Sequence, residues 1–241
     1  MLTVSSVPVT GVLIEGNNTD YTAEFEEGQV VNLVAPTTAA VAGTSYTFIR
    51  WMVDGVGQPD GVADVQVTMD IDHTLVAVYE IQRHTLTVQS MLVTTSTGRL
   101  PVIGVPIAGD APGSTNYTVT CDDGQTVTLL APRYFQMTGS AGTVDYAFQR
   151  WSVDGVDQSW EYLDVQIEMR ADHTVVAKYS LASDCDTSCS VNVLDMLRIR
   201  SALGQNVYTG ENWRMDINFD KRINLLDLLA ARNRLNKACL K

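Results

Sequence analysis

The same sequence pattern occurs twice in the first 180 residues of the chain. The segment YTFIRWMVDGVGQ at 46–58 returns as YAFQRWSVDGVDQ at 146–158. The segment DVQVTMDIDHTLVAVY at 64–79 returns as DVQIEMRADHTVVAKY at 164–179, again 100 positions later. A repeat at one fixed spacing indicates two copies of one folding unit. We therefore expect two homologous domains before residue 181.

Each copy has the residue pattern of antiparallel β-structure. Stretches rich in Val, Thr and Tyr are separated by turn signals that contain Gly, Asn and Asp. Alternating apolar positions predict strands with one buried and one solvated face. Val78 in the first copy is replaced by Lys178 in the second, so we expect this position to face water. The aromatic residues before Trp51 and Trp151 change from even to odd positions, which predicts a β-bulge before each tryptophan.

Units of ~80–95 residues with about seven short strands favour immunoglobulin-like (Ig-like) sandwiches. Trp51 and Trp151 are the expected core anchors. The pattern F-x-R-W-x-V-D-G, followed by V-x-V-x-M-x-x-D-H-T-x-x-A-x-Y, resembles bacterial Ig-like repeats of surface and secreted proteins, including internalin-type repeats. This resemblance implies one Ig-like repeat at 1–82, a second at 83–181 and a location outside the cell. It implies no chemistry.

Two acidic twelve-residue segments follow the repeats, DCDTSCSVNVLD at 184–195 and DINFDKRINLLD at 216–227. A calcium loop of this length places oxygen ligands at positions 1, 3, 5, 7, 9 and 12, the seventh being a backbone carbonyl. All-oxygen ligands with several carboxylates favour Ca²⁺ over zinc. The expected ligands are Asp184, Asp186, Ser188, the Ser190 carbonyl, Asn192 and Asp195 in the first loop, and Asp216, Asn218, Asp220, the Arg222 carbonyl, Asn224 and Asp227 in the second.

Each loop leads directly into a predicted helix, MLRIRSALG after the first and LLAARNRL after the second. The duplicated loop-helix pattern, with D-x-N-x-D-x-x-I-N-x-x-D-L-x-x-x-R-N-x-L at 216–235, resembles a type I dockerin over 182–241. The resemblance implies two F-hand loop-helix units packed as near two-fold mates, with a short middle helix near 209–214. It also implies two structural Ca²⁺ ions and docking onto a cohesin domain of another protein.

The dockerin resemblance assigns cohesin selectivity to positions 10 and 11 of each loop and to the exit helices. Two departures from the dockerin pattern affect the loops themselves. Cys189 and Lys221 stand at position 6, where dockerins usually carry Gly, and Ser188 stands where an Asp is usual, so we expect weaker calcium binding in the first loop. The positions that correspond to the partner-binding face are Val193, Leu194, Arg200, Ser201, Leu225, Leu226, Arg232 and Asn233.

The chain contains four cysteines. Cys121 aligns with Phe25 of the first copy, so we expect it to be a buried free thiol on a strand. The ends of dockerins lie close together, and the resemblance therefore implies a disulfide from either Cys189 or Cys185 to Cys239. Such a bridge closes a loop of ~50 residues and contributes roughly 4 kcal/mol in the chain-entropy model.

Composition and charge restrict the function further. The net charge of −12 argues against nucleic-acid binding, and no apolar run reaches the ~18 residues that a membrane helix needs. Two of the three histidines lie in the same D-H-T turn of each copy, and neither a nucleophile-and-base pattern nor a Gly-rich phosphate loop is present. We therefore expect a monomer that is not an enzyme.

The predicted protein is mainly β with an α C-terminal module: two tandem Ig-like sandwiches, then a dockerin at 182–241. We expect a calcium-dependent docking module that binds a cohesin-type partner and anchors part of an extracellular, polysaccharide-degrading assembly. One alternative is a carbohydrate-binding segment, because Trp160 and Tyr162 lie in a loop of the second copy and exposed aromatic rings can stack on sugars. Another is a surface stalk whose degenerate dockerin only stabilises the C-terminus.

Overall fold

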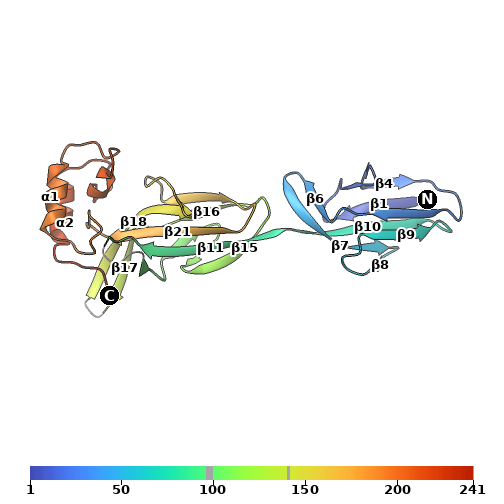
Figure 1. Cartoon of the computed structure of the whole chain (residues 1–241), viewed down its shortest axis with the longest axis horizontal. Coiled ribbons are helices and arrows are strands. Elements are labelled where there is room, and N and C mark those ends of the chain that lie inside the picture. Colours follow the sequence, from blue (N-terminus) through green and yellow to red (C-terminus); the bar gives the residue numbers. More distant parts are fainter. Residues whose placement is uncertain (96–99, 140–141, 241) are drawn as a thin grey trace. The chain divides into compact units, whose positions relative to one another are not determined.

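The computed structural model describes residues 1–95, 100–139 and 142–240, which form two compact units (Figure 1). Unit 1 contains Met1–His84 together with the short segments Thr120–Gln125 and Glu168–Ala171. Unit 2 contains the rest of the described chain, so most of the second repeat and the C-terminal segment, residues 182–240, belong to one unit. The finer division at 1–82, 83–181 and 182–241 stays a prediction.

Unit 1 is a β-sandwich-like domain. Its main sheet has the strand order β4-β1-β10-β7-β6, β8 pairs with β7, and separate ladders join β5 to β9 and β2 to β3. Buried side chains from the main sheet and from β5 and β9 form one apolar core around Trp51. The strands are β1 (Leu2–Val7), β2 (Leu13–Ile14), β3 (Asn17–Asn18), β4 (Tyr21–Ala23), β5 (Val30–Val34), β6 (Thr38–Val41), β7 (Thr44–Val53), β8 (Val56–Gly57), β9 (Asp64–Thr68) and β10 (His73–Ile81).

The second repeat has the same plan. One sheet has the order β12-β11-β21-β18-β17, with β15 beside β11 and β19 beside β18, and the other has the order β14-β13-β16-β20. The strands are β11 (Arg83–Leu92), β12 (Leu100–Pro101), β13 (Pro106–Gly109), β14 (Gly113–Ser114), β15 (Tyr117–Asp122), β16 (Thr126–Leu130), β17 (Tyr134–Gly139), β18 (Gly142–Val153), β19 (Val156–Asp157), β20 (Asp164–Glu168) and β21 (His173–Leu181).

The predicted bulge before each tryptophan is confirmed. In the first repeat the β7–β10 register shifts between Val78 and Tyr79, and in the second the β18–β21 register skips Gln149. The shift turns both indole rings into the core, where each is almost fully buried. The Trp51 Nε1 donates to the Ala63 carbonyl at 2.7 Å, and the Trp151 Nε1 makes the matching bond at 2.8 Å.

Two expectations about the repeats are wrong. The first strand of each copy pairs with the last in parallel, β1 with β10 and β11 with β21. An alternating pattern cannot report strand direction, because any strand with one buried face alternates in the same way. Lys178 does not face water: its side chain is buried and pairs with Asp157 of β19, a strand that is paired with β18. This carboxylate partner lets a buried position hold a lysine.

The C-terminal segment contains two short α-helices, α1 (Val193–Ser201) and α2 (Leu225–Asn233). A 3₁₀ helix, η1 (Asn212–Met215), lies between them and overlaps the range in which a short middle helix is expected. A small apolar core that contains Ile199, Ile217 and Ile223 lies within this segment. None of the described helices combines the length and apolar character that crossing a membrane requires.

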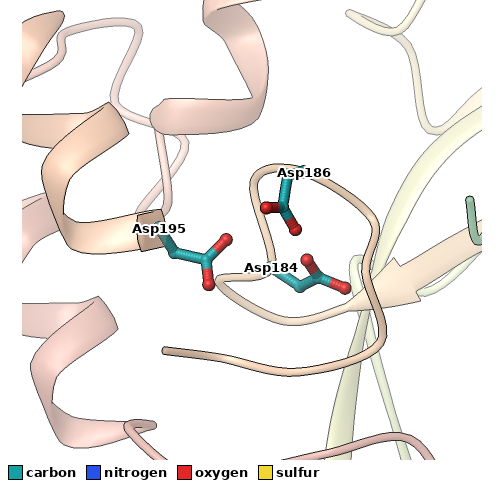
Figure 2. A group of neighbouring side chains, drawn as sticks. All are labelled: Asp184, Asp186 and Asp195. Carbon is teal, nitrogen blue, oxygen red and sulfur yellow. The ribbon is translucent and has the colours of Figure 1, made fainter. Parts of the chain in front are cut away.

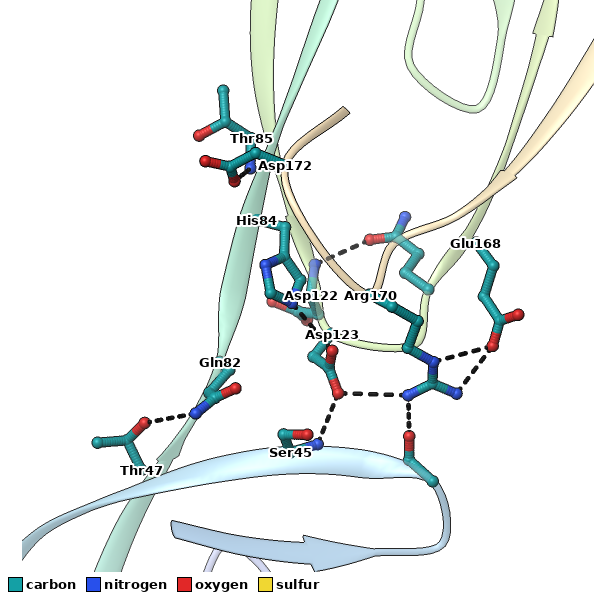
Figure 3. Close-up of polar contacts among 12 residues, drawn as sticks. Ser45, Thr47, Gln82, His84, Thr85, Asp122, Asp123, Glu168, Arg170 and Asp172 are labelled. Atoms are coloured by element: carbon teal, nitrogen blue, oxygen red, sulfur yellow. Dashed lines mark hydrogen bonds and ion pairs between the residues drawn. The ribbon is translucent and has the colours of Figure 1, made fainter. Parts of the chain in front are cut away.

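A buried carboxylate organises one polar cluster in unit 1 (Figure 3). The Asp123 Oδ2 accepts a hydrogen bond from the Ser45 backbone N–H at 2.7 Å and lies 3.3 Å from the Arg170 Nη1. Its Oδ1 lies 2.9 Å from the His84 Nε2. Burial raises the pKa of the Asp123 carboxyl, but the hydrogen bonds from His84 and Ser45 and the Arg170 charge outweigh burial and hold the pKa at about 2.

Replacement of this carboxylate is expected to loosen the Ser45 backbone. We expect the Ser45 amide to exchange with solvent about 5–150-fold faster in Asp123→Asn, because lost bonds to a buried charged group cost about 1–3 kcal/mol. The pKa of Asp123 is depressed from 3.8, so its contribution is complete above pH 4 and is lost as the pH falls towards 2. Exchange measured by NMR should therefore converge between variant and wild type near pH 2.

Asp122→Asn is the matched control for this test. Asp122 pairs with Arg83 at 3.0 Å, but both side chains are exposed, so the loss of this pair should change little. Equal exchange rates of the Ser45 amide in the two variants would contradict the role given to Asp123.

Candidate metal loops and helix surface

The two twelve-residue segments have the same backbone conformation. Thr187 and Phe219, at position 4, have φ values of 57° and 61°. Cys189 and Lys221, at position 6, have φ values of 66° and 65°. Both loops therefore place non-glycine residues in the left-handed region, which L-residues with a Cβ adopt at some cost. Positions 4 and 6 have positive φ in both loops although their side chains differ. The two loops therefore share the backbone turn and not the side chains at these positions.

The first aspartate of each loop holds this turn together. The Asp184 Oδ2 accepts from the Cys189 N–H at 2.7 Å, and the Asp216 Oδ2 accepts from the Lys221 N–H at 2.8 Å. The Oδ1 atoms accept from the backbone N–H at position 5, at 3.0 and 3.1 Å respectively. Each loop therefore wraps its backbone around a buried carboxylate.

The last two ligand positions of each loop also begin the following helix. Asn192 and Asn224 are the N-cap residues of α1 and α2, and each accepts a hydrogen bond from the backbone N–H two residues later. Asp195 and Asp227 complete a capping box in each helix and are fully buried. Anything that binds these oxygens therefore also acts on the orientation of the helix.

The first loop gathers three carboxylates. Asp184, Asp186 and Asp195 each offer an oxygen, and these oxygens lie within 4.8 Å of one another (Figure 2). Burial, followed by the hydrogen bond with Asp186, raises the pKa of Asp184 to about 7. Burial also raises the pKa of Asp195. Such a group is unfavourable when ionised unless a cation shares it, and these oxygen donors fit a hard divalent ion.

The second loop is arranged more openly. Burial raises the pKa of Asp216 to about 6, whereas Asp220 is exposed. The Asn218 Nδ2 donates to the Asp220 Oδ2 at 3.0 Å, and the Asn224 Nδ2 does so at 3.3 Å. The structure brings the expected ligand positions of both loops together. Among the described residues, however, a cluster of three carboxylates as close as this occurs only in the first loop.

An exposed aliphatic surface lies on the first turns of α1 and α2. Val193, Leu194, Leu225 and Leu226 are all exposed, as the sequence predicts for a partner-binding face. The other predicted members, Arg200, Ser201, Arg232 and Asn233, are also exposed. Leu197 and Leu229 were not predicted as members of this face, but they are also exposed. They lie 32 positions apart, as the paired residues of the two loops do, and each follows Leu194 or Leu226 by one helical turn. We define the aliphatic surface as Val193, Leu194, Leu197, Leu225, Leu226 and Leu229, whose exposed fractions are 48–70%.

Within unit 2, the second repeat packs against both loops at position 4. The Phe219 ring lies edge-on to Tyr134, with centroids 5.7 Å apart, and the Arg133 guanidinium lies 4.3 Å from its centre. The Tyr134 hydroxyl donates to the Ile217 carbonyl at 2.7 Å. In the first loop the Thr187 carbonyl accepts from the Thr95 N–H at 2.8 Å. These contacts were not predicted, because they join loops to strands that are distant in the sequence.

Trp160, the candidate sugar-binding residue, takes part in the same packing. Its ring stacks on the buried Trp213 at a centroid distance of 5.7 Å and an angle of 11°. Tyr208 lies beside it at 5.6 Å. The indole is thus engaged with the C-terminal segment, which favours a packing role over carbohydrate binding. Tyr162 is exposed.

A disulfide joins Cys189 to Cys239, with Cα atoms 5.0 Å apart. Of the two pairings left open by the sequence, the structure therefore contains the one from Cys189. Cys185 and Cys121 are free and buried, and burial raises the pKa of both thiols.

The fold and its repeats define a mainly β chain of β-sandwich-like domains with two short C-terminal helices. Residues 3–83 match the family model of the divergent InlB B-repeat domain, which confirms the Ig-like repeat part of the prediction. No curated protein matches the chain. The dockerin assignment stays a prediction.

Two solved structures are distantly similar. Streptococcal High Identity Repeats in Tandem (SHIRT) domains 3–4 of a cell surface protein are 13% identical, with a TM-score of 0.30, covering 75% of this chain and 96% of that one. A type II cohesin–X–dockerin complex from Acetivibrio cellulolyticus is 17% identical, with a TM-score of 0.23, covering 64% of this chain and 97% of that one. TM-scores this low carry no argument about function. Function is therefore inferred below from the residues of this chain and their geometry.

Proposed function

We propose that the C-terminal segment is a calcium-dependent docking module of the dockerin type, carried on two Ig-like repeats. In this proposal it acts outside the cell and binds a cohesin-type domain of another protein, as part of a polysaccharide-degrading assembly. One observation carries the proposal: two loops with the same turn each lead into a helix that exposes aliphatic residues at the same three positions.

Calcium has a direct role in this proposal. The ligands are the oxygens at positions 1, 3, 5, 7, 9 and 12 of each loop, as listed from the sequence. A bound ion would neutralise the buried carboxylates, and the N-cap asparagine and buried last aspartate of each loop would link it to the start of the helix. Since the aliphatic surface lies on those first turns, calcium binding and partner binding are linked in this scheme.

The chemistry of the surface also describes the partner. Six exposed aliphatic side chains form a surface that a partner can dehydrate, and exposed Arg200 and Arg232 lie on the same two helices. Residues 181–241 carry a net charge of +2, whereas residues 1–180 carry −14. We therefore expect the partner to present an apolar patch with acidic residues at its rim.

Binding of the full chain to recombinant cohesin domains, measured by calorimetry with calcium, tests the docking proposal. Because the two helices present equivalent residues, we expect either helix to be able to supply the main contacts. We expect the loss of one helix's contacts to be tolerated, so Val193→Asp with Leu194→Asp, or Leu225→Asp with Leu226→Asp, should each leave measurable binding. The fourfold variant should bind at least about 100-fold more weakly, because central apolar contacts are worth about 2 kcal/mol or more each.

Val30→Asp with Val34→Asp is the matched control, since these exposed valines lie in the first repeat. Full binding by the fourfold variant would rule out the aliphatic surface as the docking face. Two calcium-binding events without affinity for any cohesin would instead support a segment that only stabilises the C-terminus.

A further inference from the structure

The two loops carry the same number of carboxylates but differ at positions 3 and 5. Ser188 supplies a neutral hydroxyl where the second loop has the Asp220 carboxylate. The Ser188 Oγ lies 3.3 Å from the Ser190 carbonyl oxygen and 3.5 Å from the Asp184 Oδ1, so it faces the other ligand positions. Asp186 stands at position 3 of the first loop, where the second loop has Asn218, so each loop brings three carboxylates to the proposed ion.

Position 6 of the first loop is fastened to the end of the chain. Cys189 forms the disulfide with Cys239, and its carbonyl accepts a hydrogen bond from the Cys239 N–H at 3.0 Å. The next residues continue the pairing: Ser190 bridges Ala238, and the Val191 N–H donates to the Lys237 carbonyl at 2.8 Å. The residue that adopts positive φ and the residue that supplies the position 7 carbonyl are thus both held by the C-terminal tail.

The second loop makes the same turn without such a fastening. Lys221 has nearly the same φ as Cys189 and donates the same hydrogen bond to the first aspartate. Its side chain is exposed, and its Nζ lies 3.8 Å from the Glu161 Oε1. The chain therefore contains the same turn twice, once with a disulfide at position 6 and once without a covalent link there.

We propose that the Cys189–Cys239 disulfide is a positioning element of the first calcium loop, which holds positions 6 and 7 in their binding conformation before the ion arrives. A loop that is already ordered loses less conformational entropy on binding. The inference rests on the proposed calcium function. A disulfide that only joined the two ends of the segment would instead affect both loops alike.

The test compares the full chain with its Cys189→Ser/Cys239→Ser variant. In excess chelator, we expect amide exchange of Ser188–Val191 to accelerate in the variant, with little change at Asp220–Ile223. In calcium titrations by calorimetry, one of the two events should weaken by about tenfold, which corresponds to about 1.4 kcal/mol. Lys221→Ser is the matched control, because it places serine at position 6 of the loop that has no disulfide.

Each outcome has a distinct meaning. Equal acceleration of exchange in both loops, or unchanged binding at both, would overturn the positioning role of the disulfide. Absence of calcium binding in the wild-type chain would instead contradict the proposed function, whatever the variant does. If the double variant does not fold, Asn236→Pro keeps both cysteines but removes the N–H that donates to the Val191 carbonyl, and proline cannot adopt the φ of 67° found there. This variant should reproduce the selective weakening of one calcium event.

Discussion

Transfer from millimolar calcium to excess chelator is expected to lower the free energy of unfolding of the C-terminal segment by about 4 kcal/mol for each occupied loop. This value applies to a ligand present at about 1,000 times its Kd that binds only the folded state. The segment depends on the ion because its own core is small. Only six of its described residues are buried in the apolar cluster, and each loop also buries aspartates that repel one another when ionised.

Thermal melts in calcium and in chelator, together with calcium titration by calorimetry, measure this effect. Asp186→Asn and Asp220→Asn each change one proposed ligand and leave both helix caps intact, so each should weaken one binding event and keep the other. Asp60→Asn is the control, since Asp60 is an exposed carboxylate of the first repeat. Identical melts in calcium and in chelator would contradict the calcium proposal.

The features that were predictable from sequence are those that the chain contains twice. The bulge before each tryptophan was predicted because the same change of phase recurs 100 residues later. The buried Lys178 could have been found in the same way. Val78 and Gly57 of the first copy become Lys178 and Asp157 in the second, so the buried cation and its carboxylate partner appear together. Reading the two positions separately led to the wrong expectation that Lys178 faces water.

Unique contacts between distant segments were not predictable. The packing of Tyr134 on Phe219 and of Trp160 on Trp213 has no counterpart in the first repeat, so no comparison between copies marks it. Local patterns report which face of an element is buried, but they do not report which surface covers it. The loop ligands were predictable because their spacing is local, whereas the support that the second repeat gives to both loops depends on the tertiary fold.

Replacement of the core tryptophan of the second repeat, Trp151→Ala, is expected to destabilise unit 2 by about 3–5 kcal/mol. The change leaves a large cavity beside Phe148 and removes the hydrogen bond to the Leu163 carbonyl. Because the repeat and the C-terminal segment belong to one compact unit, the calcium-dependent melting transition should move down with it. Urea unfolding and thermal melts with calcium present, followed by circular dichroism, measure both effects.

Trp51→Ala is the matched variant in unit 1, since Trp51 occupies the equivalent position and makes the equivalent hydrogen bond. Its cost should be similar, but the calcium-dependent transition should stay where it is in the wild type. If Trp151→Ala leaves the melting temperature of the calcium-dependent transition unchanged, the C-terminal segment folds independently of the repeat, despite the contacts of Tyr134 and Trp160. A transition that responds equally to both variants would mean that the two units unfold together.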